Sequence, residues 1–150
     1  MKNTLLKKIV LSAVILFGAG SAPIALAHQS GAVPIGDDAT ATDLAAVQCY
    51  DDGGGAPDRL TVSIEDVSAP VPGLLVNMQV FKNNKMNNIT DTVSGDGNSS
   101  PAITLVGGDG EYRISVNKTG AGSRAFNATW HCETSGGVHT GTDITVLQAQ

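Results

Sequence analysis

Aromatic and basic residues are scarce in this chain, and their scarcity limits the kinds of molecule that the protein can bind. Aromatic residues make up 4% of the sequence, so a flat aromatic platform for a sugar polymer is hard to build beside a core. Three of the nine lysines and arginines lie in residues 1–27, whereas all 14 acidic residues follow, which gives residues 28–150 a net charge of −8. Such a surface repels nucleic acid and anionic lipid, because both bind through basic patches. We therefore exclude nucleic-acid partners and expect a metal ion, or an envelope or extracellular protein.

Motifs of the common catalytic sites are also missing. The sequence contains no Gly-x-Ser-x-Gly nucleophile elbow, no Gly-x-Gly-x-x-Gly, no phosphate-binding loop and no Cys-x-x-Cys-His haem site. Only two cysteines occur, Cys49 and Cys132, and a disulfide between them would leave no thiol nucleophile. These absences give no reason to propose an enzyme, and we expect a non-catalytic protein.

A bacterial-type signal peptide is predicted for residues 1–27. Lysines give it a positive start, and residues 9–20 form an apolar run that is too short for a stable membrane span. Ala25-x-Ala27 fits the small-residue rule for signal peptidase. Cleavage there would leave a periplasmic or secreted chain that begins at His28 and has no membrane span.

Export bears directly on the two cysteines. In an oxidising compartment an isolated pair indicates a disulfide, and we expect one between Cys49 and Cys132. Their separation of 83 residues would remove about 4.5 kcal/mol of denatured-state entropy. Two free thiols or a thiolate metal site are the alternatives.

Helical periodicity is absent from every long window, and short alternating strands take its place. Leu60, Val62 and Ile64 alternate with polar residues, and turns rich in Gly, Asn and Asp separate such segments. The pattern predicts an N-terminal arm over residues 28–46, followed by an antiparallel, two-sheet, immunoglobulin-like β-sandwich over residues 47–150. Its seven or eight strands are expected at residues 47–50, 59–65, 74–82, 88–93, 102–106, 111–117, 125–133 and 142–148.

Three histidines follow the predicted cleavage site, and they carry the sharpest functional hypothesis. Cleavage would give His28 a free α-amine beside its own imidazole, and these two nitrogens can chelate one metal ion. A second imidazole would complete a nitrogen-rich set that favours Cu(II). His139, expected in a loop, is the preferred partner, because loops carry binding sites more often than strand faces do. His131, expected on the outer face because Trp130 and Cys132 point inward, is the other candidate.

Oxygen ligands and a family resemblance complete this hypothesis. Glu133 and Asp143 are the nearest carboxylates in sequence. The stretch WHCETSGGVHTG, residues 130–141, resembles the end of the periplasmic copper-resistance carrier family. That resemblance implies a small copper-binding β-sandwich in which a mature N-terminal histidine and a late histidine, here His28 and His139, bind copper. The same N-terminal chelate is similar to the histidine brace of copper polysaccharide monooxygenases, although the few aromatic residues disfavour an oxidative enzyme.

Two other classes of function stay open on the sequence. The chain could be a structural surface, adhesion or filament subunit, whose N-terminal arm adds a strand to a neighbour's sheet and drives self-assembly. It could also be an accessory domain of a larger envelope complex. Acidic turns such as Asp51-Asp52-Gly53 carry oxygen ligands, but their composition is also what tight turns use, and no EF-hand spacing occurs.

Overall fold

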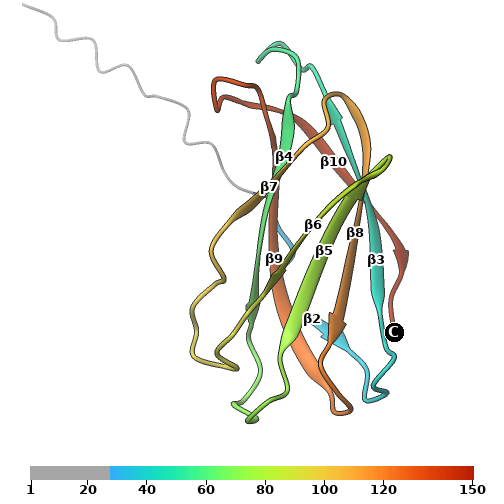
Figure 1. Ribbon diagram of the computed structural model, residues 1–150, viewed down its shortest axis with the longest axis vertical. Coiled ribbons are helices and arrows are strands. Elements are labelled where there is room, and N and C mark those ends of the chain that lie inside the picture. The colour runs from blue at the N-terminus through green and yellow to red at the C-terminus, as the bar shows by residue number, and fades with distance from the viewer. Residues whose placement is uncertain (1–27) are drawn as a thin grey trace, which may run out of the picture.

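Antiparallel β-strands form the regular structure of residues 28–150, the part of the chain that the computed structural model describes (Figure 1). The predicted signal peptide, residues 1–27, lies outside these described residues. No helix within residues 28–150 is long and apolar enough to cross a membrane. The strands are β1 (His28–Gln29), β2 (Val33–Ile35), β3 (Asp43–Tyr50), β4 (Arg59–Asp66), β5 (Val76–Lys82), β6 (Lys85–Thr90), β7 (Ile103–Val106), β8 (Gly110–Lys118), β9 (Arg124–Glu133) and β10 (His139–Gln148).

The alternation seen in the sequence is expressed as alternating burial. In β4 the side chains of Leu60, Val62 and Ile64 are buried in the core, as expected from their spacing. The polar turn between β5 and β6 is a two-residue hairpin, because Lys82 pairs with Lys85. Asn83 in this turn has a φ of 55°, a left-handed conformation that asparagine tolerates better than most residues.

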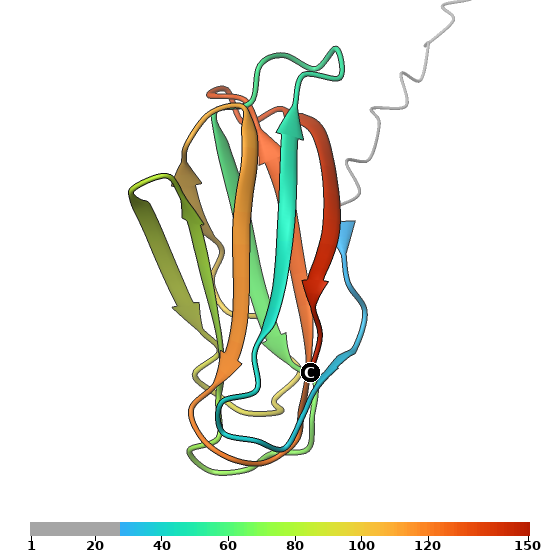
Figure 2. The ribbon, with the colours of Figure 1, turned by 90° about the vertical axis from the view of Figure 1, so that its right-hand side faces the viewer.

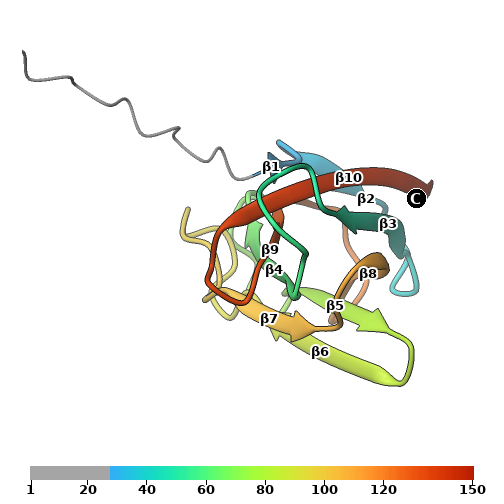
Figure 3. The ribbon, with the colours of Figure 1, turned by 90° about the horizontal axis from the view of Figure 1, so that it is seen from above.

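A single continuous path of strands, in the order β6-β5-β8-β3-β10-β9-β4-β7, surrounds the core. β10 makes it continuous, because its first residues, His139 and Thr140, pair with β9 whereas Gly141 and the residues after it pair with β3. Seen from above, the path curls until its two ends, β6 and β7, lie side by side (Figure 3). The antiparallel all-β prediction is confirmed, but the strands form one curled sheet rather than two clearly separate ones.

The N-terminal arm is docked onto the sheet. β1 and β2 both pair with β9 on the edge that β10 leaves free when it crosses to β3. Figure 2 shows this arm (blue) passing down the molecule beside β10 (red). The predicted boundary between arm and domain, at residues 46 and 47, therefore falls inside β3, which begins at Asp43.

Backbone contacts fix the far end of the arm. The amide of Gly36 donates to the carbonyl of Gln150 (2.7 Å), and the buried ammonium group of Lys118 donates to the carbonyls of Gly36 and Gly122. The amide of Gly122 in turn donates to the carbonyl of Asp37 (2.7 Å). The arm thus belongs to the same folded unit as the strands that follow it.

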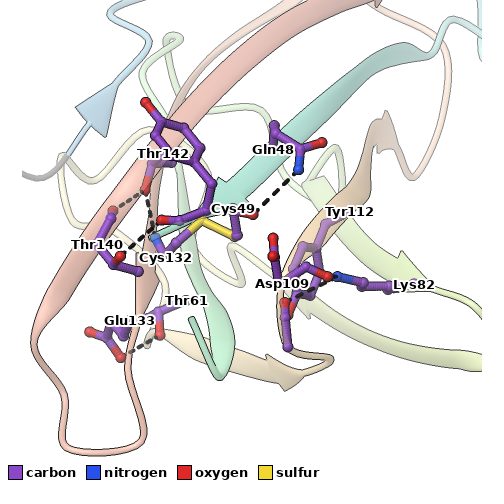
Figure 4. Close-up of a disulfide and its surroundings, with 12 residues drawn as sticks. Gln48, Cys49, Thr61, Lys82, Asp109, Tyr112, Cys132, Glu133, Thr140 and Thr142 are labelled. Atoms are coloured by element: carbon purple, nitrogen blue, oxygen red, sulfur yellow. Dashed lines mark hydrogen bonds between the residues drawn. A yellow bond between two sulfur atoms is a disulfide. The ribbon is translucent and has the colours of Figure 1, made fainter. Parts of the chain in front are cut away.

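A disulfide between Cys49 of β3 and Cys132 of β9 crosses the core (Figure 4). Both cysteines are fully buried, and their Cα atoms lie 5.6 Å apart. Thr142 of β10 lies beside the bridge, where its hydroxyl accepts a hydrogen bond from the Cys132 amide (3.0 Å). The predicted disulfide is confirmed, and it holds β9 at the point where the candidate metal ligands lie.

Candidate metal centre

Two neighbouring strands bring His131, Glu133 and His139 together. His131 and Glu133 lie two residues apart on β9 and therefore point to the same face of the strand. His139 lies on that face as well, because it is paired directly with Glu133 across the β9–β10 ladder. The sequence predicted a loop for His139, but it is the first residue of β10, and pairing with β9 fixes its position.

The side chains of these three residues are close enough to hold one ion. One potential ligand atom from each of them lies within 4.8 Å of the other two. The two imidazole rings are stacked, with centroids 4.4 Å apart and planes 17° from parallel. His131 Nε2 lies 3.1 Å from Glu133 Oε1. All three side chains are half-buried, so that the group is held by the sheet and remains reachable from solvent.

Glu133 is fixed as a carboxylate by two residues of β4. Arg59 Nε donates to Glu133 Oε2 at 2.8 Å, and the Thr61 hydroxyl donates to the same oxygen at 3.0 Å (Figure 4 shows the Thr61 contact). Burial opposes ionisation of Glu133, but these hydrogen bonds and the charge on neighbouring His131 outweigh it, so the pKa of Glu133 lies below its usual value. The other oxygen, Oε1, faces His131.

His131 is about as buried as Glu133, with 17% and 15% of their side chains exposed. Its Nδ1 atom is buried and has no hydrogen-bond partner, so that one ring nitrogen is not engaged by the protein. Burial, followed by the nearby charge of His139, keeps the pKa of His131 below its usual value, although Glu133 opposes this shift. A neutral imidazole with a spare nitrogen is the form in which histidine binds metals.

We expect the metal-free protein to lose stability as the pH falls below about 6.5, the usual pKa of histidine. The pKa of His131 is lower in the folded chain than in the unfolded chain, so the unfolded chain binds more protons in this range and is favoured. Urea unfolding in the presence of a chelator, repeated across this range, measures the slope. His131→Gln should flatten that slope, and an unchanged slope in this variant would contradict the assignment to His131.

His28 lies beside the group, on the neighbouring strand. It pairs with Trp130, and their rings are roughly parallel with centroids 6.2 Å apart. Directly opposed residues of an antiparallel pair point to the same face, so the His28 ring lies on the Trp130 side of β9 and not on the side of His131. The structure therefore groups two of the three predicted histidine ligands with Glu133, whereas the imidazole of the third, His28, lies on the other face of β9 against Trp130.

Asp143, the other predicted carboxylate, lies elsewhere. It is paired with Gln48 on the β3–β10 ladder, and its charge raises the pKa of the nearby Tyr50. Sequence reasoning missed Arg59 and Thr61, the residues that orient Glu133. Their alternation along β4 puts both on one face, but only the register of β4 with β9, which pairs Arg59 with Glu133, shows that this face carries the site.

Comparison with known proteins assigns no relative to this chain. No protein-family model, no curated protein and no solved structure matches it. The chemistry of the site therefore rests on its own residues. Two imidazoles and one carboxylate are ligands that suit Zn(II), Cu(II) and other divalent transition metals.

Proposed function

We propose that the protein is an exported, non-catalytic binding module that holds Cu(II) at the His131–Glu133–His139 group, with the processed N-terminus at His28 as a further ligand. The observation that carries this proposal is the convergence of three ligand atoms within 4.8 Å on two adjacent strands. Its cellular setting is the periplasm or the extracellular space, in keeping with the disulfide.

The surroundings of the group support metal binding. Glu133 is oriented by Arg59 and Thr61, so that one of its oxygens stays directed toward His131. Such supporting hydrogen bonds to a ligand are typical of metal sites. His131 has a buried nitrogen without a partner, an arrangement that costs stability unless something binds there.

Copper is favoured over zinc by the number of nitrogens. The group supplies two imidazoles, and the α-amine of an N-terminal His28, whose own ring lies against Trp130, would add a third nitrogen at the same end of β9. Sites built from nitrogen ligands have a higher affinity for Cu(II) than for Zn(II). The net charge of −8 on residues 28–150 also favours the approach of a cation.

Titration of the exported, processed protein with Cu(II), followed by electron paramagnetic resonance, tests this proposal. We expect one tightly bound ion per chain with nitrogen hyperfine structure, and weaker binding of Zn(II). A Gly-Ser extension before His28 is the control for the terminal ligand, and it should weaken binding and reduce the number of coordinating nitrogens. Absence of stoichiometric binding by both metals would overturn the metal function, whereas binding that ignores the extension would remove only His28 from the site.

The scaffold is, on the same proposal, an immunoglobulin-like sandwich in which β10 crosses from one layer to the other. Two features support this description. The buried residues Val47 of β3 and Val62 of β4 belong to one core cluster. The disulfide joins β3 to β9, two strands that are not neighbours in the path because β10 lies between them. This arrangement would place the metal site on the outer face of one layer.

A structural subunit is the second candidate function, and one observation favours it. From Gly141 onward β10 pairs with β3 alone, so that its other edge has no strand partner within residues 28–150. An unpaired edge of this kind can accept a strand from a neighbouring molecule. Sedimentation velocity over a range of protein concentrations distinguishes the two functions, since a metal carrier would stay monomeric and a filament subunit would assemble.

A further inference from the structure

An apolar cavity of about 160 Å³ opens into the core beside β10. Its walls come from the arm, β3, β8, β9 and β10, and nearly all of its lining is hydrocarbon. The strand β9 contributes Phe126, Ala128 and Trp130, the inward-pointing residues that alternate along it with outward-pointing residues such as His131. The cavity therefore lies on the opposite face of β9 from the metal group.

Two core-facing side chains of β10 form an open part of the wall. Ile144 pairs with the buried Val47, and Val146 pairs with Ala45, so both point toward the core side of the sheet. Both line the cavity, and they are nevertheless 40% and 67% exposed. Protein interiors are normally close-packed, so core-facing apolar side chains that solvent can reach leave room for a ligand and a route by which it enters.

The polar side chains at the rim of the cavity are already engaged by the protein backbone. The hydroxyl group of Ser30 accepts a hydrogen bond from the amide of Ala128 (2.9 Å). The side-chain amide of Gln148 donates to the carbonyl of Thr42 (2.6 Å). These contacts leave the apolar surface as the part of the lining with which a ligand can interact.

The other two polar side chains of the lining do not present a polar atom to a ligand. Asp43 Oδ1 accepts a hydrogen bond from the amide of Gln150 (2.8 Å), and Asp43 Oδ2 is buried. The indole Nε1 of Trp130 is buried as well, so only the hydrocarbon part of its ring can contact a molecule in the cavity. A charged group that entered the cavity would therefore lose its hydration without gaining a partner.

We propose that this cavity is a binding site for a small uncharged hydrocarbon of about the size of a benzene ring. The size fits, since an apolar protein cavity of about 150 Å³ is known to hold benzene. The lining selects an uncharged molecule, because burial of an unpaired charge is strongly unfavourable. The net charge of −8 on residues 28–150 disfavours anions further. Because it lies on the other face of β9, this site does not depend on the metal group.

Toluene, benzylamine and benzoate test this selectivity, since they have nearly the same size and differ in charge. Trp130 is the single tryptophan and lines the cavity, so its fluorescence in the exported protein reports on occupancy. We expect saturable binding of one toluene per chain, at least about tenfold tighter than that of benzylamine or benzoate. Equal affinity for toluene and either charged molecule, or no saturable response to toluene, would overturn the proposal.

A pair of matched variants on β9 locates the bound molecule. Ala128→Leu adds three carbon atoms to the wall of the cavity and should weaken toluene binding at least about tenfold by occupying the same space. Ala125→Leu is the same change on the same strand, but its side chain points to the outer face, so it should leave the affinity unchanged. Equal effects of the two variants would place toluene outside the cavity and contradict the proposal. If Ala128→Leu fails to fold, the comparison of the three molecules in the unaltered protein decides.

A second copy of the chain is the competing occupant of the open wall. Sedimentation velocity with and without toluene distinguishes the two cases. We expect the protein to have the same sedimentation coefficient in both, because toluene enters a cavity within one chain. A dimer that dissociates when toluene is added would show that Ile144 and Val146 are covered by another molecule, and it would overturn the proposal.

Discussion

Replacing both cysteines by alanine, Cys49→Ala with Cys132→Ala, is expected to lower the free energy of unfolding by about 4 kcal/mol or more. The bridge closes a loop with a sequence separation of 83 residues, and opening so long a loop returns a large conformational entropy to the unfolded chain. Domains of this size have a total stability of only about 5–15 kcal/mol. We therefore expect this variant to be marginally folded at physiological temperature.

Urea denaturation, monitored by the fluorescence of Trp130, measures this loss. Reduction of the unaltered protein with dithiothreitol is the matched control, and it should cause a similar loss, whereas the double variant should be insensitive to the reductant. Because Cys132 lies between His131 and Glu133 on β9, metal affinity should fall together with stability. A loss of less than about 1 kcal/mol would show that strand pairing alone holds β3 and β9 in place.

The strands themselves could be predicted because alternation of apolar and polar residues is a local signal. Leu60, Val62 and Ile64 point inward whatever the order of the strands, since only the side-chain period matters. The inward direction of Trp130 and Cys132, and hence the outward direction of His131, follows from the same period. One pattern thus fixed both the core and one half of the candidate site.

Contacts between strands could not be predicted from the sequence. The residues around His139 contain two glycines, Gly136 and Gly137, and such composition indicates a loop, but pairing with Glu133 begins β10 at His139 itself. The sequence placed residues 28–46 in an arm outside the sandwich, yet β2 needs only three residues to pair with β9. Long-range register, which depends on the whole topology, decides both cases.

The crossing of β10 is the least predictable feature and the one with the most consequences. Its first two residues remain with β9, which places His139 beside Glu133, and the rest of the strand moves to β3. The separation of the strands leaves room for β1, which brings His28 next to Trp130. A single change of partner along one strand therefore creates the metal group and the docking position of the arm.

His139→Ala is expected to weaken Cu(II) binding on the order of 100-fold or more, since changes to residues that only support a ligand already cost about 10–100-fold. The variant removes one of three convergent ligand atoms and leaves the other two in place on β9. Its half-buried position at the start of β10 makes a large loss of folding stability unexpected. Competition titration against a chelator of known affinity measures the change, and circular dichroism verifies that the fold is retained.

A matched pair of carboxylate variants determines whether Cu(II) is bound by ligands of the site or attracted by the net negative charge of the protein. Glu133→Gln removes the charge that Arg59 and Thr61 hold beside His131, and it should weaken Cu(II) binding about 10-fold or more. Glu65→Gln removes an equal charge from β4, where the side chain contacts Asn127 instead, and it should leave the affinity unchanged. If both variants weakened binding equally, the attraction would be the general effect of an acidic surface, and the two imidazoles would not define a coordination site.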